Sequence, residues 1–546
     1  MTNNPQLTTD SESVVIGFSP RSFAWPAAVG ALTVLLTAVA FPPFNLAEAA
    51  YVFAVPILLW LGRGVSFRAA LATVTASQFV LWLVLIFWLR HVTYPGYVLV
   101  AAVLGLYSSL WYLAAWRWLP AIRDTAWRGR LAGLLGLAGL WVVLEWGRTF
   151  VLSGFPWLTL AASQWERPLL LQIVAWTGAY GLSFVFIFFN LALASYFDRL
   201  MRFYRQGLRR LAPEFYLALG LLVAVAFGGF RFSVAHGQER EPLLRAGLVH
   251  PDIPQDMKWE REHAREILDI LERETLRLKG LEPDLVFWPE AVTPFPLVGD
   301  PRISFWVEGV ARELGAPLVL GSMADESEWE EDESVWRNAA FRVDPETGVG
   351  ASHYSKRKLV PFGEYIPLHR FWPWMSRIVP IGGNILPGES DAAMAVTAGG
   401  REHRIGILIC YEDVFPALAR RTVREGADFF AVISNNAWYG KEGMPSQHAA
   451  HSVLRAVETR RPVVRSTNQG WTGWIDDYGN VRDVMLDRGG SPFFRGGQVV
   501  EIHRDPYWAG RLSFYVRHGD WFVALCGLMA AGGLLVFRTG QPIITR

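Results

Sequence analysis

Eight long apolar runs constrain this chain more than any other feature of its sequence. They lie at 23–41, 46–62, 70–89, 97–116, 131–152, 169–197, 214–230 and 519–537. Each is close to the roughly 20 residues that a helix needs to cross a bilayer, although Glu48 and Pro56 interrupt the second. Hydrophobic residues make up 52% of the 546-residue chain and charged residues only 18%, a balance that is rare in soluble proteins. The sequence therefore predicts a multi-span α-helical membrane domain with about eight transmembrane helices.

The arginines between these runs predict an orientation. The connections after the second, fourth and sixth runs are rich in Arg, and those on the opposite side are poor in it. Because positive residues favour the cytoplasmic side, we expect both termini there and the region after seven crossings outside. Residues 1–20 are polar, with no removable signal peptide after them. The expected parts are a disordered 1–20, seven transmembrane helices in 21–234, an outer domain at 235–515, and a last transmembrane helix with a short cytoplasmic tail at 516–546.

The outer region has a different hydrophobicity pattern from the membrane runs. Apolar stretches of four to eight residues alternate there with charged stretches of helical period. Strands are expected at 243–249 and 284–288, and helices at 257–279 and 301–314. Alternation of this kind is typical of an α/β domain.

Cys410 stands at the end of one of these apolar stretches, Ile405-Gly-Ile-Leu-Ile409, and acidic residues follow it at once. A cysteine at the end of a buried strand, with a helix starting after it, is placed to act as a nucleophile. An inert buried thiol is the commoner reading of a lone cysteine. The other cysteine, Cys526, lies in the last apolar run, so neither a disulfide nor a cysteine-based zinc site is expected.

Two further segments place reactive groups near predicted strand ends. Glu290 follows the strand in Val286-Phe-Trp-Pro-Glu290, and Lys356 lies in Lys356-Arg-Lys-Leu-Val-Pro-Phe-Gly-Glu364. Either residue alone reads as solvated. With Cys410 they supply what acyl transfer needs: Glu290 as a base for the thiol, and Lys356 as a fixed cation for the oxyanion, beside the backbone N–H of Tyr411.

Glu, Lys and Cys in this order, in the contexts WPE, K-x3-VPFGE and ICYE, resemble the nitrilase superfamily. The membrane runs, with LVPFGEYIP, SNNAWYG, Ser153-Gly-Phe-Pro-Trp157 and the segment from Ile253 to Trp259, resemble its membrane-embedded branch, the apolipoprotein N-acyltransferases. The resemblance covers nearly the whole chain. It implies a nitrilase-like αββα sandwich for the outer domain.

The resemblance also implies roles for individual residues. Glu290, Lys356 and Cys410 would be the catalytic triad, and Glu364 would hold Lys356 charged and oriented. Tyr411, Glu412, Trp259 and Trp438 match positions that line the family's site. Counting back from Val-Pro-Phe-Gly-Glu selects Lys356, and Lys358 is then expected to be solvated or to face lipid headgroups.

Some positions depart from the family pattern. The family usually has Asp where this chain has Asn436, a Gly-Asn or Gly-Asp pair where it has His250-Pro-Asp252, and a different stretch at Phe514–Arg517. None of these positions belongs to the triad.

The resemblance implies a reaction at the outer face of the bacterial inner membrane. A phospholipid gives its sn-1 acyl chain to Cys410, and the α-amine of the diacylglyceryl-cysteine of an apolipoprotein then takes it from the thioester, as the last step of lipoprotein maturation. The expected partners are therefore the phospholipid, the apolipoprotein and the bilayer. We expect a monomer with no cofactor, no metal and no nucleic-acid partner.

Three other features of the sequence also lead to predictions. Trp372 and Trp374 lie in a segment predicted to be a lid resting in the membrane interface. His448 and His451 have helical spacing suitable for a metal, but without an acidic or cysteine partner nearby an ordinary helix face is favoured. Glu145 and Arg148 are charged residues within a membrane run, and mutual pairing or a place at headgroup level is expected.

Two alternatives remain open. A membrane-anchored amidase of the same fold would use water as acceptor and would need a small polar pocket. A transporter or receptor would need charged or broken helices at mid-membrane and would tolerate loss of Cys410.

Overall fold

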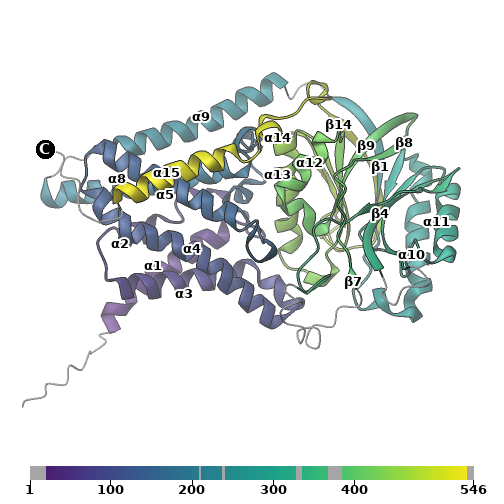
Figure 1. The fold of residues 1–546 in the computed structure, drawn as a ribbon, viewed down its shortest axis with the longest axis horizontal. Coiled ribbons are helices and arrows are strands. Elements are labelled where there is room, and N and C mark those ends of the chain that lie inside the picture. The colour runs from purple at the N-terminus through teal and green to yellow at the C-terminus, as the bar shows by residue number, and fades with distance from the viewer. Residues whose placement is uncertain (1–19, 208–210, 237–239, 328–334, 367–383, 538–546) are drawn as a thin grey trace, which may run out of the picture.

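The computed structural model describes residues 20–207, 211–236, 240–327, 335–366 and 384–537, without the side chains of 20–23, Trp259 and Asn384. The helices before residue 237, together with the last helix, form one half of the molecule, here called the membrane half (Figure 1). The residues between them form an α/β half that lies beside it.

Among the described residues, five helices of the membrane half are long and apolar enough to cross a membrane. They are α3 (Phe67–Leu85), α4 (Tyr94–Arg123), α5 (Trp127–Gly147), α8 (Ala179–Gln206) and α9 (Pro213–His236). The last helix, α15 (Trp521–Phe537), packs along α5, where a Cβ on Gly139 would lie only 2.5 Å from the carbonyl oxygen of Cys526. Glycine at such a position lets two helix backbones approach closely without a side chain between them.

The expected count of about eight spans is not confirmed, because the other apolar runs form shorter helices. These are α1 (Pro20–Val39, of which Ala24–Val39 is apolar), η1 (Ala47–Tyr51) with α2 (Val55–Leu61), α6 (Pro168–Leu171) with α7 (Val174–Thr177), and α15. The run 169–197 breaks at Gly178, which has φ +66° before α8 begins. Prolines at helix starts and this glycine interrupt runs that composition alone reads as continuous.

The α/β half contains two mixed sheets. The strand order is β14-β1-β2-β3-β4-β5 in the first, where β6 and β7 also pair with β4, and β13-β12-β11-β10-β9-β8 in the second. The first sheet comprises β1 (Glu241–His250), β2 (Leu285–Phe287), β3 (Leu318–Asp325), β4 (Val335–Asp344), β5 (Gly348–Val349), β6 (Tyr354–Ser355), β7 (Asn384–Ile385) and β14 (Gly496–Arg504). The second comprises β8 (Met394–Ala398), β9 (Arg401–Ile409), β10 (Phe429–Asn435), β11 (Val463–Asn468), β12 (Gly473–Ile475) and β13 (Val481–Val484).

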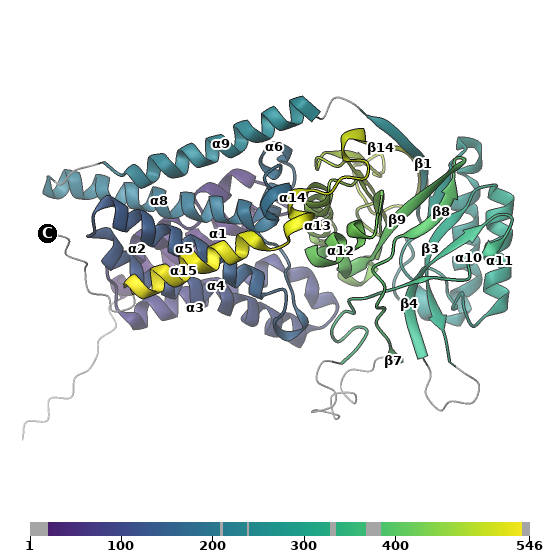
Figure 2. The same cartoon turned by 45° about the horizontal axis from the view of Figure 1, so that its top comes forward.

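These sheets face each other and are covered by helices on both outer sides, which gives four layers (Figure 2). Side chains such as Phe287, Ile407 and Ile433 fill the space between the sheets. The first sheet packs against α10 (Ala264–Leu276) and α11 (Pro301–Leu314). The second packs against α12 (Pro416–Arg424) and α13 (Met444–Thr459), which lie between it and the membrane half. This is the αββα arrangement expected for the outer domain.

Parallel strands bring their carboxyl ends to the same edge of each sheet. β1, β2 and β3 are parallel in the first sheet, and β9, β10 and β11 are parallel in the second. Glu290 follows β2 and Cys410 follows β9, so the topology carries both residues to one end of the sandwich.

Gln447 of α13 joins the two halves through its buried side-chain amide. Its Nε2 donates to the carbonyl oxygens of Pro42 (3.1 Å) and Leu85 (2.9 Å). Its Oε1 accepts from the indole N–H groups of Trp88 (3.0 Å) and Trp157 (2.9 Å). All the hydrogen bonds that an amide side chain can make are therefore directed at the membrane half.

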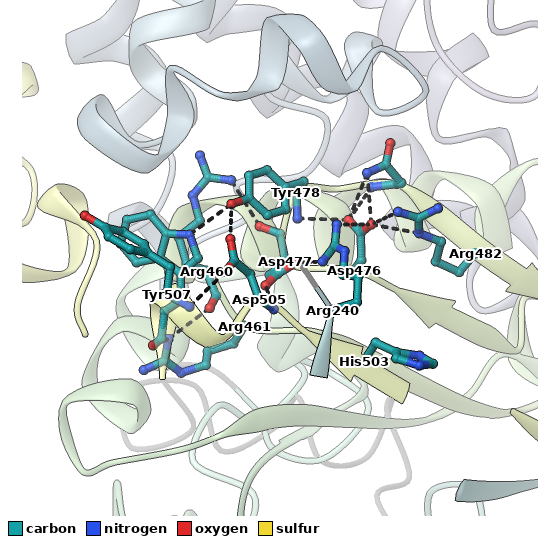
Figure 3. Close-up of polar contacts among 12 residues, drawn as sticks. Arg240, Arg460, Arg461, Asp476, Asp477, Tyr478, Arg482, His503, Asp505 and Tyr507 are labelled. Atoms are coloured by element: carbon teal, nitrogen blue, oxygen red, sulfur yellow. Dashed lines mark hydrogen bonds and ion pairs between the residues drawn. The ribbon is translucent and has the colours of Figure 1, made fainter. Parts of the chain in front are cut away.

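A second junction surrounds Arg460, directly after α13 (Figure 3). The Arg460 guanidinium lies 4.9 Å from the ring centroids of Phe232 and Tyr478, and donates to Gln172 Oε1 at 2.7 Å. Phe232 belongs to α9, and Gln172 directly follows α6, so both come from the membrane half. We call the charged residues at this junction the Arg460 cluster; they are Arg240, Arg460, Asp476, Asp477, Arg482 and Asp505.

Candidate active site

Cys410 lies at a sharp bend between β9 and a short 3-10 helix, Cys410–Val414, which precedes α12. Its φ of +52° is uncommon for a residue with a side chain, and such strain persists only where the surroundings hold it. The carbonyl oxygen of Cys410 lies 3.1 Å from His448 Nε2, which also lies 2.8 Å from Asp413 Oδ1. Because both oxygens are acceptors, this nitrogen carries the proton and donates it. The helix expected after Cys410 is α12, which begins at Pro416.

Glu290, Lys356 and Glu364 meet around a shared set of hydrogen bonds. Lys356 Nζ lies 3.0 Å from Glu290 Oε1 and 3.0 Å from Glu364 Oε1. Asn338 Nδ2 donates to the same two oxygens at 2.8 Å each. The other oxygen of Glu290 accepts the backbone N–H of Asn435, at the end of β10, at 3.0 Å. We call Glu290, Lys356, Glu364 and Asn338 the Glu290 cluster.

The protonation states in this cluster follow from burial and from the neighbouring charges. Burial alone would lower the pKa of Lys356, but the carboxylates of Glu290 and Glu364 raise it well above its ordinary value. Burial would likewise raise the pKa of Glu290, but the Lys356 ammonium and its hydrogen bonds lower it on balance. At neutral pH the site therefore holds a carboxylate and an ammonium in contact.

The Cys410 thiol is protonated at rest. Burial, and next the charge of Glu290, raise its pKa to about 12, and the charge of Lys356 only partly offsets them. The charges of Glu290, Lys356 and Glu364 all act on the thiol, so Cys410 lies near the Glu290 cluster. A neutral thiol beside an ionised carboxylate is the arrangement that general-base activation requires.

Glu412 links the Lys356 segment to the Cys410 bend. Its two oxygens accept the backbone N–H groups of Ile409 (2.7 Å), Arg357 (2.6 Å) and Lys358 (3.1 Å), and the hydroxyl of Tyr354 (2.7 Å). Burial raises the pKa of this carboxyl, and Arg357 and these donors oppose the rise. The side chain therefore fixes the segment that carries Lys356 relative to Cys410.

Tyr411 connects the site to the membrane half. Its hydroxyl donates to the carbonyl oxygen of Gly154 at 2.8 Å, and its ring stacks on Phe155 with centroids 6.0 Å apart. Tyr365, next to Glu364, donates to Ser153 Oγ at 2.5 Å. The segment 153–157 noted in the sequence is thus the part of the membrane half that contacts the site.

The structure shows few contacts between the four predicted site tryptophans and the Glu290 cluster. Trp438 is 46% exposed, whereas its neighbour Tyr439 is partly buried and interacts electrostatically with Cys410 and Glu290. Only the backbone of Trp259 is described, within the 3-10 helix η5 (Met257–Trp259). Trp372 and Trp374, with the proposed lid, lie outside the described residues.

Lys258 is a second buried lysine in the site, and it was not among the residues predicted from the sequence. Its Nζ donates to the carbonyl oxygen of Glu290 at 3.3 Å, and its charge interacts with Glu290 and Cys410. Burial lowers the pKa of Lys258 to about 8. A lysine next to an amphipathic helix ordinarily reads as solvated, and only its position beside Trp259 could have pointed to the site.

His448 and His451 have protein partners in this structure. His448 bonds to Asp413 and Cys410 as described above, and His451 Nε2 accepts the backbone N–H of Leu158 at 3.3 Å. Among the described residues, no group of three or more His, Cys, Asp or Glu side chains is arranged to hold a metal.

Asn436 and His250, two of the departures from the family pattern, are also buried. Asn436 Oδ1 accepts the Ser434 hydroxyl at 3.0 Å, and His250 Nδ1 lies 2.8 Å from Thr472 Oγ1.

Comparison with known proteins decides the family. Residues 15–192 match the model of the apolipoprotein N-acyltransferase N-terminal domain, and residues 250–491 match that of the carbon-nitrogen hydrolases. An apolipoprotein N-acyltransferase from Geobacter metallireducens is 34% identical over 515 residues, covering 92% of this chain and 93% of that protein. The chain belongs to the apolipoprotein N-acyltransferase family. A relative of the same name from Brucella melitensis is 30% identical over 91% of this chain and 93% of its own.

This apolipoprotein N-acyltransferase family member is an enzyme of the acyltransferase class, and its α/β half is a nitrilase-like domain. A solved amidase of the nitrilase superfamily from Nesterenkonia AN1 is 18% identical to it and aligns with a TM-score of 0.36, covering 52% of this chain and 97% of that one. Because that TM-score is low, the assignment of the nitrilase-like domain rests on the family model and the sequence relatives.

Proposed function

We propose that this protein transfers the sn-1 acyl chain of a phospholipid to the α-amine of the N-terminal S-diacylglyceryl-cysteine of apolipoproteins. The reaction runs in two steps through a thioester on Cys410, and it is the last step of bacterial lipoprotein maturation. Glu290, Lys356 and Cys410 are the catalytic residues, and Glu364, Tyr411 and Glu412 support them.

One observation carries this proposal. The neutral Cys410 thiol lies at a strained bend beside an ionised Glu290 and a charged Lys356, at the junction with the membrane half. A nucleophile at that junction can meet an acyl ester whose chains remain in the bilayer.

In the first step, Glu290 takes the proton from Cys410 Sγ as the sulfur attacks the ester carbonyl carbon. The negative charge that develops on the carbonyl oxygen faces Lys356 Nζ and the backbone N–H of Tyr411. When the tetrahedral intermediate collapses, the glycerol oxygen leaves with the proton from Glu290. The products are a lysophospholipid and an acyl-thioester on Cys410.

In the second step, the neutral α-amine of the diacylglyceryl-cysteine attacks the thioester. Glu290 takes a proton from the attacking nitrogen and returns it to Cys410 Sγ as the carbon–sulfur bond breaks. An amide forms, and the thiol is restored.

The proposed location follows from the charge distribution of the connections. The Arg-rich connections support a location in the inner membrane with both termini in the cytoplasm and the α/β half on the periplasmic side. The apolar helices support residence in a bilayer. We propose a monomer that needs no cofactor.

Intact-mass measurement after incubation with phospholipid tests the first step. Wild-type protein is expected to gain the mass of one acyl chain, and Cys410→Ala is expected to gain none. Adding a synthetic diacylated lipopeptide should then remove the adduct and acylate the peptide. Triacylation of the peptide by wild-type protein that forms no adduct would exclude the two-step scheme.

The same experiment separates the amidase alternative. If water were the acceptor, the adduct would decay to free fatty acid at the same rate with or without the lipopeptide. For the acyltransferase, decay should accelerate with lipopeptide concentration, and fatty acid should be a minor product.

A further inference from the structure

The peptide group between Cys410 and Tyr411 is held at one end and used at the other. Its N–H belongs to Tyr411, which is the second residue of a 3-10 helix, where an N–H has no partner inside the helix. Its carbonyl oxygen belongs to Cys410. The peptide is trans and planar, so its C=O and N–H point in opposite directions. Whatever holds the carbonyl oxygen therefore also sets the direction of the N–H.

His448 of α13 holds the carbonyl end. Its Nε2 donates to the carbonyl oxygen of Cys410 at 3.1 Å and to Asp413 Oδ1 at 2.8 Å. The ring is fully buried, and its Nδ1 makes no hydrogen bond to any described residue. A buried nitrogen without a partner costs free energy, so packing alone does not explain a histidine at this position.

Asp413 fixes the orientation of the His448 ring. Its other oxygen, Oδ2, accepts the hydroxyl of Ser452 at 2.5 Å and NH1 of Arg465 at 2.7 Å. All three side chains are fully buried, and they come from the 3-10 helix after β9, from α13 and from β11. Hydrogen bonds to a carboxylate from a charged donor are short and strong, so this carboxylate offers His448 a fixed acceptor.

The backbone of Cys410 makes such an anchor necessary. Its φ of +52° is strained for a residue with a side chain. Without the bond from His448, the following peptide can rotate toward a less strained conformation, and the N–H of Tyr411 then turns with it. The bond also polarises the peptide, which makes that N–H a stronger donor.

We propose that His448, oriented by Asp413, is a positioning residue that aims the Tyr411 N–H at the oxyanion formed during acyl transfer. His448 acts only through the peptide and does not touch the substrate. This inference deepens the proposed function and rests on it in one respect, the use of the Tyr411 N–H as an oxyanion donor. A purely structural role, in which His448 only satisfies a buried carbonyl, would lower stability and leave the chemistry of the folded protein unchanged.

Three variants separate these roles. His448→Phe keeps a ring beside Trp157, whose centroid lies 5.7 Å away, and removes the N–H donor. His448→Gln keeps a donor, because the amide nitrogen of glutamine reaches close to the position of imidazole Nε2. Asp413→Asn keeps the shape of the carboxylate but can no longer accept hydrogen bonds on both sides.

His451→Phe is the matched control. His451 lies three residues further along α13, and its ring centroid is 5.1 Å from that of Trp157. Its Nε2 accepts the backbone N–H of Leu158 instead of donating to Cys410. The control therefore changes the same residue type against the same tryptophan without touching the peptide after Cys410.

Two reactions of Cys410 are measured on each folded full-length protein in detergent. Acylation by p-nitrophenyl butyrate passes through a tetrahedral oxyanion, and a single-turnover burst of p-nitrophenolate gives its rate. Alkylation by iodoacetamide displaces iodide without forming an oxyanion, and peptide mass mapping at Cys410 gives its rate. Both reactions need the thiol proton to leave, so the ratio of the two rates isolates the contribution of the oxyanion donors.

His448→Phe should lower the acylation rate by about 10- to 50-fold, while alkylation stays within about 3-fold of wild type. His448→Gln should recover acylation to within about 5-fold of wild type, because a donor returns. Asp413→Asn should lower the ratio by less than His448→Phe does, and His451→Phe should leave it within about 2-fold of wild type.

Three results would overturn the proposal. A ratio for His448→Phe within about 2-fold of wild type would mean that His448 only satisfies the carbonyl. Equal losses in acylation and alkylation would mean that the thiol, and not the N–H, is displaced. Equal losses in His448→Phe and His448→Gln would mean that the ring shape matters and its N–H does not.

Asp413→Asn gives the same ratio if His448→Phe does not fold, and an unchanged ratio there would also contradict the proposal. The soluble ester replaces the phospholipid in all of these measurements. A failure of the proposed acyl donor and a failure of this inference therefore appear in different experiments.

Discussion

The Glu290 cluster and the Arg460 cluster are both buried groups of charged residues, yet their charges are balanced differently. Asp476 and Asp477 of the Arg460 cluster are paired with Arg240 and Arg482, and aromatic rings surround Arg460. In the Glu290 cluster, the two carboxylates of Glu290 and Glu364 share one ammonium, that of Lys356. The comparison indicates that the Arg460 cluster joins distant segments through separate ion pairs, whereas in the Glu290 cluster one ammonium holds two carboxylates close together beside the Cys410 thiol.

Lys356→Met should break the Glu290 cluster most severely. It leaves two carboxylates facing each other and removes the cation from the developing oxyanion. We expect the rate of acyl-enzyme formation to fall by about 100- to 1,000-fold. Single-turnover intact-mass kinetics measure this rate, and a change of under 3-fold would contradict the assigned role.

Arg460→Met should lower the stability of the protein and leave its catalysis nearly unchanged, the opposite of what we expect for Lys356→Met. Removing one partner of a buried charge network costs about 3–5 kcal/mol, so we expect a lower melting temperature in detergent. Because Arg460 belongs to the other junction, the acylation rate per folded molecule should stay within about 3-fold of wild type. A catalytic loss at unchanged stability would show that the two clusters are not separable.

Lys258→Met should change how the stability of the protein depends on pH. Burial lowers the pKa of Lys258 to about 8 from an ordinary value of 10.5. Below pH 8 both folded and unfolded wild-type chains carry this proton, and the folded state bears the full cost of burying the charge. Between pH 8 and 10.5 the unfolded state binds more protons, so wild-type stability rises relative to Lys258→Met by up to about 3 kcal/mol. Thermal unfolding of both proteins across this range measures the effect, and a constant difference would contradict it.

Lys358→Met should have the smallest effect and serves as the control for Lys356. Lys358 is half-buried, with its ammonium 4.8 Å from the ring centroid of Phe415, away from the carboxylates of the Glu290 cluster. We expect stability within about 0.5 kcal/mol of wild type and acylation within about 3-fold. A loss as large as that of Lys356→Met would mean that the wrong lysine was chosen.

Sequence reasoning reached the family and the layered α/β half because their signals are local. A short stretch of sequence is enough to recognise each of them: the apolar strand that ends at Cys410, and the motifs around Glu290 and Lys356. The assigned roles of these residues stay predictions that the variants above test. The number of membrane spans was harder to predict, because composition does not show where Gly178 or a proline at a helix start interrupts a run.

Other site residues could not be found because their positions depend on packing between distant segments. Asn338 lies on β4 and bonds to Glu290 across the sheet, and nothing in its own strand indicates this. Tyr439, not Trp438, faces inward because the 3-10 turn Ala437–Tyr439 sets the direction of both side chains. Lys258 of η5 contacts Glu290, which follows β2, although 32 residues separate the two in the sequence.

The burial of α13 has a consequence for how substrates come and go. From Gln447 to Thr459 every residue of this helix is buried between the second sheet and the membrane half. A surface of that kind cannot swing open on a hinge, and the α/β half made alone would expose it to water. If the proposed substrates are right, they have to reach Cys410 around the edge of this contact, because the contact itself stays closed.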